Sequence, residues 1–416
     1  MPKILKVALF ALGTRGDVQP YAALAQALQS AGHQPLLITA GDFSKLAGEA
    51  GVPSLSLPGD VHATLEDPAL KLLFQQGRFV AIQRHLASVV RGFAAEWART
   101  AAEAAEGHDL IIAGLGGFFL AQGVADKLAL PLVQAHLVPI TTTRAFAAPV
   151  APAWLDRAGG LIRAASYPLV RKAALAGMTS AERIARNTLR LAAKRGSSLG
   201  KGTILYGISP TVGPRPVDWP DTVQMTGYWF LEPQAGYEAP EDVRNFLDAG
   251  EPPVVVTFGS MPSIDPEELV TMVLAALRLS GRRAFLVTGW GGLKPGNLPS
   301  PIFACSEIPH RWLFPKAAAV VHHGGAGTTA ASLAAGRPTI VMPVFGDQAF
   351  WGRRVATLGA GPLPMPLRTL QAEDLARAID QATAGSMPER AQMIGHRISA
   401  EDGGQAAVGE LERLFA

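Results

Sequence analysis

Continuous apolar runs recur along the first half of the chain, and stretches with helical spacing separate them. The runs cover residues 4–12, 34–40, 109–114 and 130–138. Runs of this length without polar alternation predict strands that are buried on both faces of a parallel sheet. Between them, residues 21–32 and 118–129 carry apolar side chains at the spacing of a helix. This alternation predicts a doubly wound α/β domain.

The same pattern restarts in the second half of the chain. Four more apolar runs cover residues 252–260, 282–289, 317–323 and 337–344. A segment rich in proline and glycine precedes them, as is typical of a linker. We therefore expect an N-terminal domain over residues 1–210, a linker over 211–238 and a second α/β domain over 239–395.

Composition excludes several classes of protein. Of the 416 residues, 48% are hydrophobic and 17% are charged, which indicates a well-buried globular protein. The net charge of +3 is too small for a nucleic-acid-binding surface, so no nucleic-acid partner is expected. The single cysteine, Cys305, forms no intrachain disulfide, and no apolar stretch approaches the roughly 20 residues of a membrane span. We expect a soluble cytoplasmic protein without a signal peptide.

One segment is strongly basic. Residues 157–201 contain ten lysines and arginines and a single acid, Glu182. Arg183, Arg186, Arg190 and Lys194 recur at helical spacing. This pattern favours a solvated helix face, and the alternative is a helix that rests on an anionic membrane surface as a peripheral contact.

A glycine-rich loop in the second half is the first candidate site. Residues 317–344 predict a strand, a loop, a helix and a strand, with "HHGGAGTT" in the loop. A helix that begins near Thr328 would offer unpaired N–H groups to a phosphate, and His323 and the Thr328 hydroxyl can bond phosphate oxygens. Thr328 can equally cap the helix. The alternative is a purely structural glycine-rich turn. His322 precedes His323 on a strand, so it should face the other way.

Other phosphate motifs are absent, and a sugar site lies nearby. The chain lacks the Walker-type motif G-x-x-x-x-G-K-[ST], which argues against an ATPase or a kinase. It also lacks the G-x-G-x-x-G spacing, which argues against an NAD-binding protein. Asp347 and Gln348 follow the next strand and therefore lie on the same edge of the sheet. A carboxylate beside a carboxamide suits vicinal hydroxyls. Together the two loops suggest a nucleotide-sugar site.

Several segments now resemble one family. Residues 309–362 resemble the donor-binding segment of the family-1 glycosyltransferases with the GT-B fold. The nearest branch holds the sterol glucosyltransferases and the bacterial antibiotic and glycolipid glycosyltransferases, and residues 13–28, 137–149 and 209–230 also fit it. The resemblance implies an α/β GT-B fold in which two Rossmann-like doubly wound domains face a central cleft. We also expect a C-terminal helix over 396–416 that returns to the N-terminal domain.

The resemblance implies a role for each site residue. His323 and the segment Gly325, Ala326, Gly327 and Thr328 would hold the diphosphate, with Ser260 as a further contact. Asp347 and Gln348 would hold the sugar, and the Ile308 backbone would meet the nucleobase. Asp17 would be the general base of an inverting transfer. The ribose-binding glutamate of plant members falls at Ala331, which leaves UDP and TDP both open.

The expected activity is transfer of a hexose from UDP-glucose to a hydroxyl of a lipophilic acceptor, such as a sterol, terpenoid or polyketide. No metal or other cofactor is expected, because His323 and the helix N-terminus would stabilise the leaving diphosphate. The alternatives are a TDP-deoxysugar glycosyltransferase for natural products or glycolipids, a nucleotide-sugar epimerase and a non-catalytic binder. For Asp17 the alternative is a turn or helix-capping role.

Overall fold

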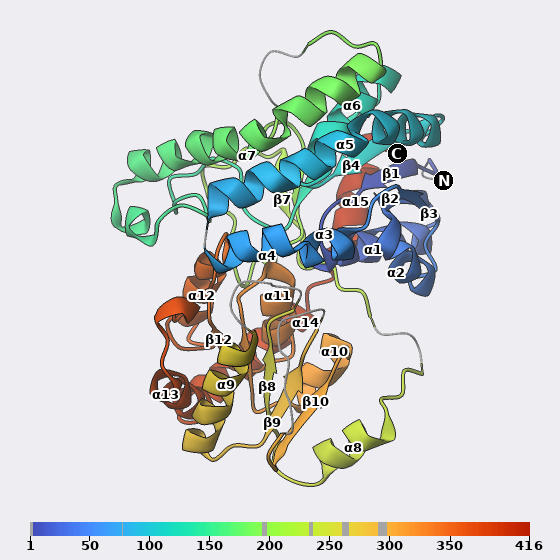
Figure 1. Ribbon diagram of the computed structural model, residues 1–416. Coiled ribbons are helices and arrows are strands. Elements are labelled where there is room, and N and C mark those ends of the chain that lie inside the picture. The colour runs from blue at the N-terminus through green and yellow to red at the C-terminus, as the bar shows by residue number, and fades with distance from the viewer. Residues whose placement is uncertain (1–2, 77, 194–197, 233–235, 260–265, 290–297) are drawn as a thin grey trace. The chain divides into compact units, whose positions relative to one another are not determined.

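The computed structural model describes residues 3–76, 78–193, 198–232, 236–259, 266–289 and 298–416 (Figure 1). The chain forms two compact units. The first comprises Met1–Leu73, Arg78–Leu231 and Asp402–Ala416, and the second comprises Phe74–Gly77 and Glu232–Glu401. The chain therefore leaves the first unit, completes the second, and returns to the first.

The first unit is built on a seven-stranded parallel sheet with the order β3-β2-β1-β4-β5-β6-β7. The strands are β1 (Lys6–Phe10), β2 (Gln34–Ala40), β3 (Ser54–Leu57), β4 (Leu110–Ala113), β5 (Leu132–His136), β6 (Ile204–Tyr206) and β7 (Val223–Met225). The chain order reverses between β1 and β4. In open α/β sheets, ligands bind at the carboxyl ends of the strands beside such a reversal.

Helices cover both faces of this sheet. They are α1 (Arg15–Ser30), α2 (Ser44–Glu49), α3 (Val61–Glu66), α4 (Pro68–Gln75), α5 (Phe79–Ala105), α6 (Phe118–Leu128), α7 (Gly160–Thr188) and α15 (Gly403–Phe415), with the 3₁₀ turns η1 (Gly41–Phe43) and η2 (Ala153–Arg157). Alternate strand residues such as Phe10 and Ile111 pack on α5 and α6 in one apolar core. The α1 helix packs against β2 and α15. Because both faces are covered, the strands require continuous apolar runs.

The second unit repeats this plan on a five-stranded parallel sheet with the order β10-β9-β8-β11-β12. Its strands are β8 (Val254–Thr257), β9 (Ala284–Val287), β10 (Ile302–Cys305), β11 (Ala319–His322) and β12 (Thr339–Val341). Val254 and Val256 pack into one core, whereas Val255 between them packs into the core on the other face. This split follows from the two-residue period of a strand. The order reverses between β8 and β11, which places the loop after β11 at the reversal.

The helices of the second unit are α8 (Glu241–Asp248), α9 (Pro266–Ser280), α10 (His310–Leu313), α11 (Ala326–Ala334), α12 (Gln348–Thr357), α13 (Ala372–Ala382) and α14 (Met387–Ser399), with η3 (Phe314–Lys316) and η4 (Leu367–Thr369). The α9 and α13 helices cover one face, and α8, α10 and α11 lie over the other. No helix in the described ranges combines the length and hydropathy needed to cross a bilayer.

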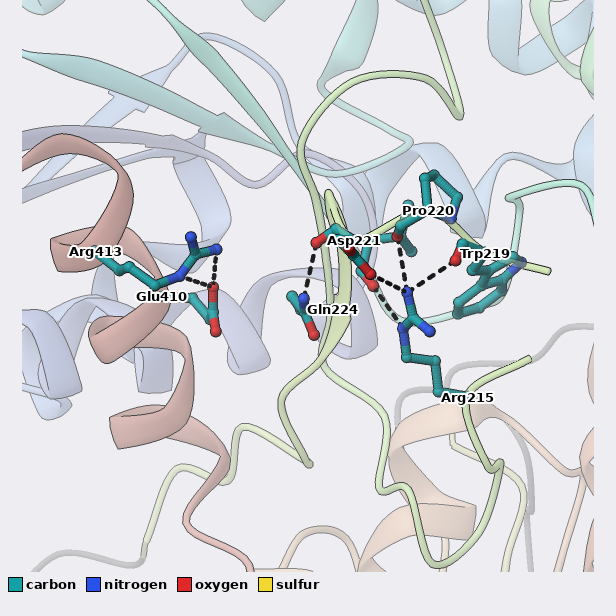
Figure 2. A network of polar contacts seen from close by, with 8 residues as sticks. Arg215, Trp219, Pro220, Asp221, Gln224, Glu410 and Arg413 are labelled. Atoms are coloured by element: carbon teal, nitrogen blue, oxygen red, sulfur yellow. Dashed lines mark hydrogen bonds and ion pairs between the residues drawn. The ribbon is translucent and has the colours of Figure 1, made fainter. Parts of the chain in front are cut away.

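The segment 211–238 differs from the expected linker. It contains β7, the edge strand of the first sheet. Arg215 fixes the turn before β7, because its guanidinium donates hydrogen bonds to three backbone carbonyls, those of Val223 (3.0 Å), Trp219 (2.9 Å) and Pro220 (2.8 Å) (Figure 2). The strand was not predicted because the segment is rich in proline and glycine. A strand of three residues is also too short to show the two-residue alternation of a β-strand.

The expected helix over 396–416 is two elements. The α14 helix ends at Ser399 and α15 begins at Gly403, with Asp402 as N-cap. Asp402 Oδ1 accepts a hydrogen bond from the Gln405 amide at 3.0 Å. A β-carbon on Gly403 would lie 2.4 Å from the Tyr228 carbonyl oxygen. Glycine therefore lets the start of α15 lie against the first unit.

The basic stripe in residues 157–201 is not a continuous solvated face. The α7 helix ends at Thr188, and Arg190 adopts a left-handed conformation with φ of 59°. Arg186 is buried and its guanidinium forms an ion pair with Asp126 on α6 at 2.5 Å. Lys194 lies outside the described residues. The helical spacing of these charges was therefore misleading, because Arg186 serves packing within the unit.

Candidate functional site

The loop after β1 places a carboxylate at the start of α1. Gly13 turns the chain with φ of 145°, a conformation that favours glycine. A β-carbon on Gly13 would lie only 2.5 Å from Oδ2 of Asp17. Both the backbone conformation and the nearby carboxylate therefore require glycine at this position.

Asp17 closes the first turn of α1. Its Oδ2 atom accepts hydrogen bonds from the Thr14 amide and the Thr14 hydroxyl, each at 2.9 Å. Thr14 is the N-cap and Asp17 is the third helical residue, so this is the reciprocal contact of a capping box. Both bonds fall on one oxygen, and Oδ1 has no hydrogen-bond partner among the described residues. The helix-capping role is thus real, and it leaves one carboxylate oxygen available.

The surroundings of Asp17 shift its proton affinity. The residue is solvent-exposed, but desolvation by the protein around its carboxyl raises the pKa of Asp17, against the two bonds from Thr14 that lower it. Burial and the nearby Asp17 charge raise the pKa of Tyr21, one helical turn further on. The Tyr21 hydroxyl donates to the Ala135 carbonyl. A carboxylate with a raised pKa is better suited to accept a proton during a reaction.

The loop after β11 leaves a helix N-terminus uncapped. The α11 helix begins at Ala326 with Gly325 as N-cap, and no side chain caps it. The first helical bond runs from the Thr329 amide to the Gly325 carbonyl at 2.9 Å. The helix therefore begins two residues before Thr328, which lies inside the first turn, and the alternative that Thr328 caps the helix is wrong. The amides of Ala326, Gly327 and Thr328 precede the helical ladder, which makes this end a ready anion-binding site.

His323 lies against this uncapped end. A β-carbon on Gly325 would lie 2.6 Å from His323 Nε2, and one on Gly259, after β8, would lie 3.5 Å from Cε1. Nδ1 of His323 is buried without a hydrogen-bond partner among the described residues. Burial lowers the pKa of His323 to about 4. The imidazole is therefore neutral at physiological pH and can donate one hydrogen bond.

His322 stabilises the loop through a hydrogen bond to its backbone. It is fully buried, and its Nδ1 accepts a hydrogen bond from the Gly324 amide at 2.9 Å. Burial, with smaller effects from His323 and His310, lowers the pKa of His322. Gly324 has φ of 93°, and a β-carbon on it would meet Val341 at 2.6 Å. His322 thus serves packing and loop geometry, as its strand position predicted.

Asp347 and Gln348 follow β12, the neighbouring strand. Asp347 Oδ2 accepts a hydrogen bond from Trp351 Nε1 at 2.6 Å, and Asp347 is the N-cap of α12. The Gln348 Oε1 atom accepts from the amides of Val344 (2.7 Å) and Phe345 (3.1 Å). Gln348 is buried, and its backbone lies within 3.0 Å of the β-carbon position of Gly324. The structure therefore brings this pair next to the His323 loop.

The remaining predicted residues are less informative. Ile308 is buried between β10 and α10 in an apolar cluster that includes Ala331. Ser260 lies outside the described residues. Across the described ranges, no group of three or more His, Cys, Asp or Glu side chains is arranged to hold a metal ion.

The glycines that support the site were not predicted from the sequence. Gly13 and Gly324 have positive φ, and a β-carbon on them would meet Asp17 and Gln348 respectively. Thr14 and Asp17 have the T-x-x-D spacing of a capping box, so this contact was readable from the sequence. The closeness of Gly324 to Gln348 had no local signal, because it depends on two neighbouring strands.

Two family models match parts of this chain. Residues 7–102 match the family described as "Glycosyltransferase family 28 N-terminal domain". Residues 292–414 match "Erythromycin biosynthesis protein CIII-like, C-terminal domain". Among solved structures, the glycotransferase of kitacinnamycin covers 100% of both chains with a TM-score of 0.71 and 18% identity. VinC in complex with DTDP has a TM-score of 0.69 at 19% identity and covers 99% of each chain. These two structures show the fold.

Curated relatives are more similar in sequence. The sterol 3-beta-glucosyltransferase UGT80B1 of Arabidopsis thaliana is 34% identical over 98% of this chain and 68% of its own length. The sterol 3-beta-glucosyltransferase of Cryptococcus neoformans var. neoformans serotype D is also 34% identical, over 99% of this chain. The chain spans only 27% of that fungal relative.

The fold and these relatives define a glycosyltransferase of the GT-B class. Within that class, the chain belongs to family 1, on the branch that includes the sterol glucosyltransferases and the antibiotic glycosyltransferases.

Proposed function

We propose that the protein transfers glucose from UDP-glucose to the hydroxyl of a lipophilic acceptor, with a sterol as the first candidate, and with inversion at the anomeric carbon. The observation that carries the proposal is the uncapped N-terminus of α11 with the neutral His323 beside it and Asp347 and Gln348 on the adjacent loop. The sterol is suggested by the names of the relatives that are 34% identical.

Donor binding follows from the groups in the second unit. The amides of Ala326 and Gly327, the Thr328 hydroxyl and one N–H of His323 would donate to the diphosphate. Asp347 and the Gln348 carboxamide would bind the glucose hydroxyls. Because Gln348 Oε1 already accepts two backbone amides, its contribution to the sugar is the NH₂ group.

The chemical step uses Asp17. The acceptor oxygen attacks the anomeric carbon while its proton passes to Oδ1 of Asp17, the oxygen that takes no part in the helix cap. The bond from the anomeric carbon to the diphosphate oxygen breaks, and the diphosphate keeps the electron pair. Its added negative charge is stabilised by the donors of the α11 N-terminus, which requires no metal ion in this proposal.

The test is a panel of UDP- and TDP-sugars offered with sterol, flavonoid and macrolide acceptors, read by mass spectrometry, with and without EDTA. We expect a glucosylated sterol from UDP-glucose and nucleotide release that depends on the acceptor. Conversion of the donor without an acceptor would instead indicate an epimerase. Loss of activity with EDTA would contradict the metal-free departure.

A second donor remains a candidate because of Ala331. This residue is buried in an apolar cluster and offers no carboxylate for a ribose hydroxyl. Such a site fits a deoxyribose as well as a ribose, and one solved structure of similar fold was determined with DTDP. TDP-sugars in the panel above test this alternative: preferential transfer from a TDP-deoxysugar would replace UDP-glucose as the donor.

A further inference from the structure

Exposed apolar side chains gather at one place in the first unit. Of the fourteen large hydrophobic side chains that are exposed in the described part of the chain, five lie within residues 150–169. Val150 lies in the turn before η2 and Trp154 lies in η2, whereas Leu161, Ile162 and Leu169 lie in the first turns of α7 (teal to green in Figure 1). We call this set the α7 patch. Trp154 is 66% exposed, Leu161 71% and Leu169 69%. Scattered exposed residues need no explanation, whereas a cluster indicates a surface that binds something.

The part of the patch that lies on α7 forms one face of that helix. Exposed residues of α7 recur at the positions of a single helical stripe, which are Leu161, Ile162, Ala165, Pro168 and Leu169. Tyr167 on the opposite side is buried, and so is Ser166 at the edge of the stripe. A surface helix ordinarily turns its polar face outward. The first half of α7 does the reverse, although its second half presents polar residues such as Arg183 and Asn187.

The patch is held in place by hydrogen bonds. The Ala147 amide donates to Asp156 Oδ1 at 3.0 Å, and the Ala148 amide donates to Ser166 Oγ at 2.9 Å. Arg163 Nη1 donates to the Ala145 carbonyl at 3.0 Å. These bonds join the loop before η2, η2 itself and α7. The apolar side chains are therefore presented by a fixed surface.

Most charged residues near the patch are basic, although the acid Asp218 also lies there and accepts the Arg144 amide at 2.7 Å. Residues 140–181 contain five basic residues and one acid. Arg144, Arg157 and Lys172 are exposed, and the acid, Asp156, accepts the amide of Ala147. A second copy of the same surface would bring like charges together. An anionic surface with an apolar interior would match both the basic rim and the apolar face.

We propose that the α7 patch docks on anionic lipid bilayers, with Trp154 and the leucines inserted at the headgroup boundary and Arg144, Arg157 and Lys172 on lipid phosphates. This places the membrane contact at the apolar end of α7 and not on the arginines near residues 183–190. The docking goes beyond the proposed glycosyl transfer and does not depend on it.

The experiment is flotation of the full chain with vesicles of phosphatidylcholine alone or with about 30% of the anionic lipid phosphatidylglycerol. The variant carries Leu161→Glu and Leu169→Glu. The control carries Leu279→Glu and Met393→Glu, two exposed apolar residues of α9 and α14, so the charge change is equal. A second pair tests the basic residues. The double variant Arg157→Gln/Lys172→Gln is compared with its control, the double variant Arg183→Gln/Arg190→Gln. Thermal unfolding confirms that each variant is folded, and light scattering gives its mass.

We expect the wild type to float with anionic vesicles and to bind neutral ones at least about tenfold more weakly. The Leu161/Leu169 variant should lose about tenfold or more in binding, and its control less than about twofold. The Arg157/Lys172 variant should weaken binding more than the Arg183/Arg190 variant. Equal loss in a variant and its control, or absence of flotation, would overturn the proposal. A wild-type dimer that the Leu161/Leu169 variant dissociates would overturn it too, since the patch would then join two copies. Because no donor or acceptor is present, the result is independent of the proposed reaction.

Discussion

Asp17 combines two roles at the scale of one residue. Its Oδ2 atom caps α1 through Thr14, and its Oδ1 atom is the oxygen assigned to the reaction. The two roles separate by chemistry, because an asparagine can still accept the Thr14 bonds but cannot take a proton at neutral pH.

Asp17→Asn should therefore keep the fold and lose the reaction. We expect turnover to fall about 100-fold or more, which is the usual contribution of a general base, with donor affinity within about twofold. Asp17→Ala should lose turnover similarly and also lose about 1 kcal/mol of stability with the cap. Steady-state kinetics, calorimetric titration of UDP-glucose and thermal unfolding measure the three effects. Near-normal turnover of Asp17→Asn would rule out Asp17 as the base.

The raised pKa of Asp17 predicts a pH dependence. The base must be deprotonated, so kcat/KM should fall as the pH drops through the pKa of Asp17, which lies above the ordinary aspartate value. The residual activity of Asp17→Asn should lack this acidic limb. A pH–rate profile of both proteins, with stability checked at each pH, makes the comparison. An identical acidic limb in the variant would assign it to another group.

Gly13→Ala should displace Asp17. The new β-carbon would lie 2.5 Å from the Asp17 carboxylate on a backbone with φ of 145°. We expect a loss of about 1–3 kcal/mol in unfolding free energy and a drop in turnover. Gly16→Ala is the matched control, because a β-carbon there meets nothing closer than 3.7 Å. Equal effects of the two substitutions on turnover would contradict this account of Gly13.

At the scale of an element, the first turn of α11 separates a structural role from a binding role. Two adjacent threonines differ in what their hydroxyls do. The Thr329 hydroxyl is buried and donates to the Gly325 carbonyl at 2.9 Å. The Thr328 side chain is only half-buried, on the turn assigned to the diphosphate.

Thr328→Val and Thr329→Val should therefore have opposite effects. We expect Thr328→Val to weaken UDP-glucose binding about tenfold with little change in stability, as for a hydrogen bond to a charged group. Thr329→Val should cost about 1 kcal/mol in stability with a smaller effect on binding. Calorimetric titration and denaturant unfolding distinguish them. Unchanged donor affinity in Thr328→Val would remove Thr328 from the diphosphate site.

Elements also show how far the sequence predicts this structure. The long apolar strands and the loops after β1 and β11 were predictable, because a sheet covered on both faces requires continuous apolar runs. The strands β6 and β7 have three residues each, too few to show a period. The ion-pair partner of the buried Arg186 lies 60 residues away on α6. The placement of Gln348 beside Gly324 likewise depends on strand order, which no local pattern encodes.

At the scale of the whole molecule, α15 belongs to the first unit although it follows the second in sequence. It packs on α1, and Glu412 lies 3.3 Å from the buried His33. Leu411 is fully buried in this contact region, whereas Leu414 is 40% exposed.

Leu411→Ala should accordingly destabilise the first unit alone. We expect a loss of about 2–5 kcal/mol, because truncation of a buried leucine leaves a cavity. Leu414→Ala on the same helix should cost less than about 1 kcal/mol. Differential scanning calorimetry that resolves two transitions, with UDP-glucose added to identify the second unit, measures each. A shift of the ligand-dependent transition in Leu411→Ala would contradict the assignment of α15.

The return of the chain to the first unit also sets an order of events during synthesis. Synthesis delivers most of the second unit, residues 232–401, as one continuous segment before residues 402–416 are made. The first unit, although most of it emerges earlier, must wait for residues 402–416 before α1 is covered. The first unit is therefore begun before the second and completed after it, and until residues 402–416 are added the side of α1 that α15 covers stays open to solvent.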